Sequence, residues 1–147
     1  MYKNLLVPVD GSDLSDRAMQ ASIDLARQLG AAIVGFVAEP DMPLPNVGTQ
    51  PTVYARQREV HEQHVDGHAH EVLTRFGAMA REAGVEFRGR HAVTDSVDTA
   101  IAQLAQELEC DMIVMVTHGR GAFGELLFGS HTKNVLSKCK IPLLVLH

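Results

Sequence analysis

The chain has 147 residues, of which 46% are hydrophobic and 21% are charged, and its formal net charge is −5. These values are typical of one globular domain with a sizeable core. The negative charge and the scarcity of aromatic residues argue against nucleic-acid binding, which depends on cations and stacking rings. No apolar stretch is long enough to span a membrane, and residues 1–11 lack a signal-peptide pattern. We therefore expect a cytoplasmic protein that does not insert into membranes.

The first forty residues have the pattern of a β-α-β unit. Residues 4–9 are a short apolar run, in which Pro8 must lie near the end because it cannot donate to a strand ladder. After a short turn, the spacing of apolar residues predicts a helix over 13–29, which Gly30 ends. Residues 32–38 are a second uncharged run, so we expect two parallel strands joined by a right-handed crossover.

The middle of the chain predicts a loop, a long helix and an edge strand. Four prolines between residues 39 and 51 indicate a loop, which is long for a compact domain and is therefore either functional or flexible. We expect a helix from about Tyr54 to Ala83, because its apolar residues form one stripe. A strand over 85–93 follows, in which apolar and polar residues alternate as at a sheet edge.

The last third of the chain adds two helices and two strands. Residues 94–96 offer a helix cap, and an apolar stripe follows over 97–108. Residues 112–116 form an uncharged strand, which leads into a glycine-rich loop. A helix over 130–138 and a final strand over 143–146 complete the pattern.

Five predicted strands alternate with four helices over the whole chain, residues 1–147. This pattern predicts a single doubly wound α/β domain with a five-stranded parallel sheet and helices on both faces. In the strand order 3-2-1-4-5, the winding reverses between the first and fourth strands and leaves a crevice at their carboxyl ends. That crevice would be lined by residues 8–11 on one side and by residues 116–119 on the other. Doubly wound sheets bind their ligands at this place.

The glycine-rich loop before the last helix is suited to binding phosphate. Glycines let backbone N–H groups approach an anion, and a helix that begins at Ser130 adds unpaired N–H groups and a favourable dipole. Residues 124–130 have the glycine spacing of a P-loop but lack its lysine, so they are not a Walker A motif.

Several polar residues around the crevice have two readings. Asp10 could face a ribose or a metal ion, or it could be a turn residue that bonds its own backbone. Ser130 could bind phosphate and also cap the helix, since the two roles are compatible. Arg120 and His118 could reach a phosphate, or they could lie in a solvated loop.

Four histidines crowd the long helix, and His64, His68 and Glu71 have a spacing that could bind zinc. We favour ordinary helix histidines, because no further ligand stands at a fixed spacing nearby. Cys110 and Cys139 lie at the ends of predicted elements, so we expect free thiols in a reducing cytoplasm and no thiol catalysis.

The last predicted strand, residues 143–146, has no charge although the strand order places it at an edge of the sheet. Monomeric proteins usually protect such an edge. We therefore expect it to pair with a second copy in a homodimer, the alternative being a covered edge in a monomer.

Four segments resemble the universal stress protein family, and the resemblance extends over essentially the whole chain. They are LLVPVDGS near the start, IVMVTHGRG, LLFGS and the closing IPLLVLH. Nucleotide-binding members carry the motif Gly-x2-Gly-x9-Gly-Ser/Thr. Gly119, Gly129 and Ser130 match it, whereas Val116 stands at the position of its first glycine.

The resemblance implies a cytoplasmic homodimer, open to further assembly, that binds ATP between the first and fourth strands together with a divalent ion such as Mg²⁺. It implies no particular protein ligands for that metal. By position, the residues that it places around the nucleotide are Pro8, Val9, Asp10, Val37, Met115, Val116, His118, Gly119, Arg120, Gly129, Ser130, His131 and Thr132.

Three functions fit these observations. We favour a regulatory module, not an enzyme, in which ATP orders residues 117–130 and changes the surface shown to a partner. The resemblance implies a membrane transporter or a signalling enzyme as that partner, and residues 40–51 and 120–128 are the expected contacts. The alternatives are a slow Mg²⁺-dependent ATPase and an interaction protein with an empty crevice. ATP turnover would be weak, because there is no Walker lysine and no obvious base.

Overall fold

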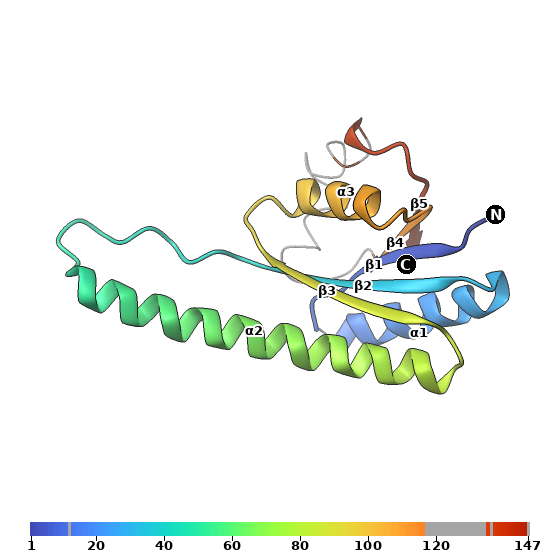
Figure 1. The fold of residues 1–147 in the computed structure, drawn as a ribbon, viewed down its shortest axis with the longest axis horizontal. Coiled ribbons are helices and arrows are strands. Elements are labelled where there is room, and N and C mark those ends of the chain that lie inside the picture. Colours follow the sequence, from blue (N-terminus) through green and yellow to red (C-terminus); the bar gives the residue numbers. More distant parts are fainter. Residues whose placement is uncertain (12, 117–134, 136, 147) are drawn as a thin grey trace.

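The computed structural model describes residues 1–11, 13–116, 135 and 137–146 (Figure 1). The glycine-rich loop and the start of the last predicted helix lie outside these residues. Five parallel strands form one sheet in the order β3-β2-β1-β4-β5, which confirms the predicted order. The strands are β1 (Asn4–Pro8), β2 (Ala32–Glu39), β3 (Phe87–Val93), β4 (Met112–Val116) and β5 (Leu143–Leu146).

Three of the four predicted helices lie within the described residues, and the structure contains all three. They are α1 (Asp13–Leu29), α2 (Pro51–Glu82) and α3 (Val97–Glu107). α2 begins earlier than the expected Tyr54, because proline is favoured in the first turn of a helix, where its missing N–H has no partner to lose. Ser96 is the N-cap residue of α3, within the predicted residues 94–96, but its side chain makes no capping hydrogen bond, and its N–H donates to Thr94 Oγ1 (3.0 Å).

Helices cover both faces of the sheet, so each central strand is buried on both sides. In β1, Leu5 and Val7 pack in the core under α1 and α2, whereas Leu6 packs in the core under α3. This two-sided burial explains why the strands read as uncharged runs instead of alternating patterns. No helix in the described part of the chain is long and apolar enough to cross a membrane.

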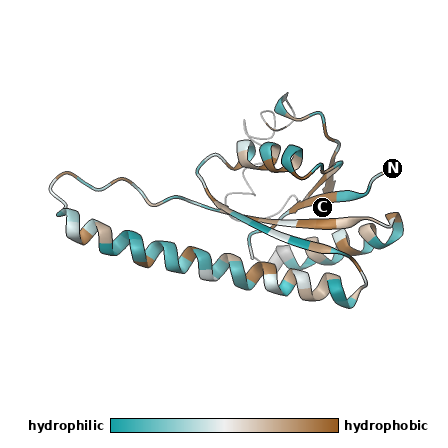
Figure 2. Cartoon of the chain, in the orientation of Figure 1, coloured by the Kyte–Doolittle hydropathy of each residue, from teal (hydrophilic) through white to brown (hydrophobic). Residues whose placement is uncertain are grey.

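The segment from residue 40 to residue 64, here called the arm, projects beyond the sheet (Figure 1). It consists of the loop after β2 and the first half of α2. None of the α2 side chains before Val65 is buried, and Figure 2 shows this half of the helix as mostly hydrophilic. Several apolar side chains of the arm are nevertheless strongly exposed, among them Leu44 at 87%, Val47 at 108% and Val60 at 66%.

Asp111, just before β4, joins the two central strands at their amino ends. Its carboxylate accepts hydrogen bonds from the backbone N–H groups of Lys3 (2.7 Å) and Asn4 (3.0 Å). Its own N–H donates to the carbonyl of Asn4 (3.0 Å). β1 and β4 are therefore fastened where they begin.

We predict that Asp111→Ala lowers the free energy of unfolding by about 1–3 kcal/mol, because two backbone donors lose a charged acceptor. Asp111→Asn, which keeps one acceptor oxygen, should lose less. Urea denaturation measures both, with Glu71→Ala on the exposed face of α2 as the control. A loss no larger than that of the control would contradict the role of Asp111.

Candidate functional site

The candidate site lies at the carboxyl ends of β1 and β4, here called the switch point. β1 pairs with β2 over its whole length but with β4 only at Leu5 and Leu6. β4, in turn, pairs with β5 from Ile113 to Val116. The ladder between the two central strands therefore stops short of their carboxyl ends, where the strand order reverses. This is the place at which doubly wound sheets bind ligands.

Pro8 explains why the ladder stops there. In a parallel strand, alternate residues bond the neighbours on either side. The backbones of Lys3 and Val9 both bond β2 (2.8 Å each), so by this alternation Pro8 faces β4. The next bond of the ladder would need an N–H from Pro8, and proline has none.

The structure describes the strand residues of the predicted nucleotide site. The side chains of Pro8, Val9, Val37 and Met115 are buried in the core, and Val37 is completely inaccessible. Asp10, two residues beyond the end of β1, is half-buried. Val116 ends β4, and its side chain is outside the described part. Also outside it are His118, Gly119, Arg120, Gly129, Ser130, His131 and Thr132.

The turn after Asp10 rests directly on α2. Gly11 has φ = +80°, and a Cβ at this position would lie 2.7 Å from Val72 Cγ2 and 2.9 Å from His68 Nε2. Both distances are shorter than any ordinary carbon contact. Glycine is therefore needed twice here, for its backbone conformation and for its lack of a side chain.

Glu39 holds His68 in this contact. It is the last residue of β2, and its carboxylate accepts a hydrogen bond from Nδ1 of His68. The end of β2, the turn at Gly11 and α2 thus meet beside the switch point. This junction was not predicted from the sequence. Its signal was the Asp10–Gly11 turn, but the reason for the glycine lies on a helix far along the chain.

The zinc hypothesis for His64, His68 and Glu71 gains no support from the geometry. Within the described residues, no three His, Cys, Asp or Glu side chains gather where they could hold a metal. His68 contacts Glu39 instead, and Nε2 of His61 lies 3.2 Å from the carbonyl of Pro40. These histidines join α2 to the end of β2 and to the loop that follows it.

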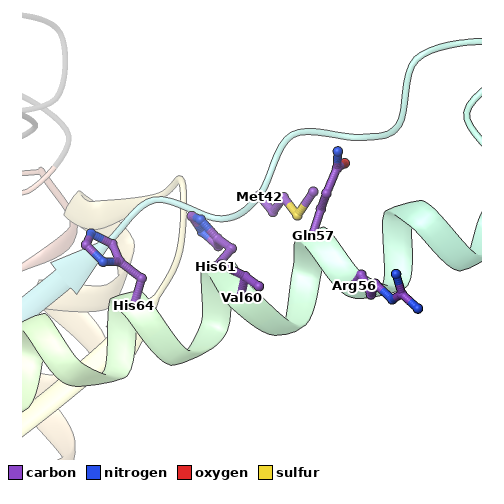
Figure 3. A pocket seen from close by; sticks show the side chains of 6 residues that line it. All are labelled: Met42, Arg56, Gln57, Val60, His61 and His64. Atoms are coloured by element: carbon purple, nitrogen blue, oxygen red, sulfur yellow. The ribbon is translucent and has the colours of Figure 1, made fainter.

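A hollow of about 500 Å³ lies along the arm. Figure 3 shows Gln57 and His61 extending from α2 toward the loop that carries Met42. The hollow has no carboxylate in its lining, which is completed by Arg56, Val60 and His64. It lies apart from the switch point, on the projecting part of the molecule.

Neither cysteine is suited to nucleophilic chemistry. Both are buried and free. Burial raises the pKa of the Cys110 thiol to about 11, with the Asp111 carboxylate adding to the effect. Cys110 therefore remains a protonated, unreactive thiol at neutral pH.

The family model described as the universal stress protein family matches residues 1–147. The chain belongs to the universal stress protein family. A universal stress protein from Thermus aquaticus is 30% identical over 145 residues, which cover 99% of this chain and 98% of that protein. The membership that LLVPVDGS, IVMVTHGRG and IPLLVLH predict is thereby confirmed.

Two solved universal stress proteins with a bound nucleotide share this fold. One, in complex with cAMP, is 25% identical with a TM-score of 0.67, and the match covers 99% of this chain and 97% of that one. The other, from Archaeoglobus fulgidus, is in complex with dAMP. It is 21% identical with a TM-score of 0.62, over 99% of this chain and 98% of that one.

We predict that Gly11→Ala destabilises this universal stress protein more than Gly84→Ala does. Both glycines have a positive φ (+80° and +75°), but a Cβ at Gly84 would meet nothing within 4 Å. Gly84→Ala should cost about 1 kcal/mol from backbone strain alone. Gly11→Ala should cost about 1–3 kcal/mol more, because its methyl group collides with α2. Urea denaturation compares the two, and equal losses would show that α2 yields to the methyl group.

Proposed function

We propose that this protein binds ATP with Mg²⁺ at the switch point and acts as a nucleotide-dependent regulatory module through partner proteins. The observation that carries the proposal is the early end of the β1–β4 ladder at Pro8, beside the half-buried carboxylate of Asp10. The family's cAMP complex supports an adenine nucleotide as the ligand class, and the dAMP complex shows a like fold holding one.

The described residues supply a wall and an acceptor for such a ligand. Pro8, Val9 and Met115 are apolar residues at the ends of β1 and β4, where an adenine ring would lie. Asp10 would accept hydrogen bonds from the ribose hydroxyl groups. Val37 is fully buried, so it would support this wall from beneath rather than touch the ligand.

The loop residues complete the proposal through the family motif. Gly119, Gly129 and Ser130 would bind the ribose and phosphates through backbone N–H groups and the hydroxyl group. The polar side chains near the two ends of the loop would surround the phosphates, namely His118, Arg120, His131 and Thr132.

Mg²⁺ fits this chemistry as a companion of the nucleotide. The described residues gather no set of three metal-binding side chains, so they offer no cage for a metal on its own. Mg²⁺ is usually held by substrate phosphates with one or two carboxylates. We assign no protein ligand to Mg²⁺, because Asp10 faces the ribose hydroxyl groups in this proposal.

Binding without rapid turnover is the form of the proposal that the residues favour. Phosphoryl transfer needs a cation on the γ-phosphate and a group that positions water. No lysine or arginine stands between β1 and α1, and the Walker lysine is absent. A slow ATPase is therefore the second candidate. A protein that binds no nucleotide, with Val116 blocking the motif, is the third.

We predict that Asp10→Ala weakens ATP binding at least about tenfold, because a charged hydrogen bond contributes about 1.5–3 kcal/mol. Isothermal titration with Mg²⁺ and ATP measures the dissociation constant. Asp24→Ala, on an exposed position of α1, is the matched control and should bind like the wild type. Unchanged affinity in Asp10→Ala would remove Asp10 from the site.

The same samples separate the three candidate functions. ADP that accumulates when the wild type is incubated with Mg²⁺ and ATP would favour the ATPase. A wild-type protein that binds neither ATP nor cAMP would overturn the proposal and favour the interaction protein. Tight binding with stable ATP is the outcome that the regulatory proposal requires.

We also propose a homodimer formed through β5 at the edge of the sheet. Its side chains are uncharged and only half-buried within one subunit. Pro142 accepts a hydrogen bond from Ile113 on β4 (2.9 Å), so the alternation of a parallel ladder turns the N–H groups of Leu143 and Val145 outward. These are the donors that a second β5 would use.

We predict that Val145→Pro converts the dimer to a monomer. The substitution removes an outward N–H and leaves the bonds between β4 and β5 in place, as proline at a sheet edge can. Val145→Ile keeps the N–H and should remain dimeric. Sedimentation velocity distinguishes the two states. A wild type that sediments as a monomer would refute the dimer.

The partner surface belongs to the same proposal. The arm exposes Leu44, and it exposes Val60 in the lining of the hollow of Figure 3; exposed apolar groups on a projecting segment fit protein contacts. Together with residues 120–128, the arm would contact a membrane transporter or a signalling enzyme in the cytoplasm.

A further inference from the structure

A groove runs along the other edge of the sheet, between β3 and α2. Its volume is about 440 Å³. One wall is the face of α2 between His70 and Arg81, and the other is formed by Phe87, Gly89 and His91 of β3. We call it the β3 groove. Figure 1 shows β3 lying alongside α2 on the side of the sheet away from β5.

The outer edge of β3, beside this groove, presents backbone N–H and carbonyl groups. Glu86 accepts from Ile33 on β2, and Thr94 donates to Glu39 at the end of β2 (2.8 Å each). By the alternation of a parallel ladder, the even-numbered residues of β3 bond β2 and the odd-numbered residues turn outward. Within the described residues no strand pairs with this outer edge. One outward carbonyl, that of Gly89, accepts from the neighbouring Arg90 side chain (2.9 Å).

Glycines give the groove its depth and leave its middle open. A Cβ at Gly77 of α2 would lie 3.0 Å from the Phe87 ring, so the helix lies close to the strand. A Cβ at Gly89 would lie 3.4 Å from Leu73, so the absence of a side chain there exposes an apolar floor. Leu73 and Phe87 form that floor, and it has room for side chains of a ligand.

Basic side chains surround the edge on both faces of the sheet. Arg81 and His91 line the groove, while Arg88 and Arg90 stand exposed on the opposite face of β3. β3 itself contains no acidic residue. Two of these side chains already have carboxylate neighbours: Arg88 pairs with Glu86 (3.1 Å), and His91 lies 3.5 Å from Asp66. Among the described residues, no ion pair holds Arg81 or Arg90.

We propose that the β3 groove binds an extended acidic peptide segment of a partner protein, which adds to the sheet as a strand beside β3. An edge strand flanked by a helix is a recurrent site for such strand addition, in which the backbone gives affinity and alternate side chains give specificity. Apolar residues of the peptide would contact Leu73 and Phe87. Its carboxylates would face Arg81 on one side of the sheet and Arg90 on the other.

Charge selects this occupant over the other candidates. A second copy of the chain would bring its own Arg88 and Arg90 against the same residues, and like charges on paired strands are destabilising. A nucleic acid would meet a protein with a net charge of −5 and no backbone strand to pair. The proposal does not depend on nucleotide binding, because the groove lies at the edge of the sheet, away from the switch point.

The test uses a fluorescein-labelled peptide of seven residues, the length of β3, with the sequence Glu-Glu-Val-Glu-Val-Glu-Glu, which places glutamates on both faces of the added strand and the two valines on one of them. Fluorescence anisotropy with the full chain should show saturable binding. A lysine–valine peptide of the same length should not bind. A glutamate–valine peptide with N-methyl groups on alternate backbone nitrogens should bind at least about tenfold more weakly, because it cannot pair with a strand. Equal affinity for the N-methylated peptide would overturn strand addition.

Protein variants locate the site. Gly89→Pro removes an outward N–H of β3 without touching the bonds to β2, and Arg81→Glu reverses a charge in the groove. Each should weaken binding of the glutamate–valine peptide at least about tenfold. Arg27→Glu, in the last turn of α1 as Arg81 is in the last turn of α2, changes the net charge equally and should stay within about twofold.

Four further outcomes would overturn the proposal. They are no binding by the wild type, an equal loss in Arg27→Glu, an unchanged affinity in Arg81→Glu, and equally tight binding of a single-stranded oligonucleotide of the same charge. Circular dichroism checks that the variants fold. If Gly89→Pro does not fold, the N-methylated peptide alone tests strand addition. ATP titration of the same variants keeps this test separate from the nucleotide proposal.

Discussion

The structure depends on a central strand that must pair on both sides and still leave its carboxyl end unpaired on one of them. β1 meets this requirement through Pro8, which continues the strand beside β2 but cannot donate to β4. At the other end, the carboxylate of Asp111 fastens the same two strands together. β1 and β4 are thus joined at their amino ends and unpaired at their carboxyl ends, near Asp10.

The two edges of the sheet solve the problem of exposed strands in opposite ways. β5 carries no charge, and its half-buried apolar side chains suit a partner of the same kind. β3 carries arginines and a glycine, which oppose pairing with another copy and leave a groove beside α2. In our proposals, one edge therefore serves self-association and the other binds a different, acidic partner. An isologous dimer through β5 would leave both β3 edges accessible.

Much of the fold could be predicted, because it follows from local patterns. Residues 112–116 and 143–146 are short uncharged runs, and their bounds as strands were predicted correctly. Gly30 ends α1 with a positive φ, as expected of a helix stop. Less of the candidate site could be predicted from the sequence. Its position follows from strand order, but the loop assignments rest on the family motif. The contact between Gly11 and α2 joins residues that are distant in sequence, and no local pattern signals it.

α2 is the element that links the switch point, the arm and the β3 groove. Its middle touches the turn after Asp10 through His68 and Val72, and Glu39 fixes that contact at the end of β2. Its amino half forms the arm, and its carboxyl half forms a wall of the β3 groove. At Gly11 there is no room even for one methyl group. A movement of this turn toward α2 must therefore displace His68 or the helix itself, since packed interiors transmit strain rather than absorb it. A ligand at the switch point that moves the turn in that direction would consequently act on the helix that carries both outer surfaces.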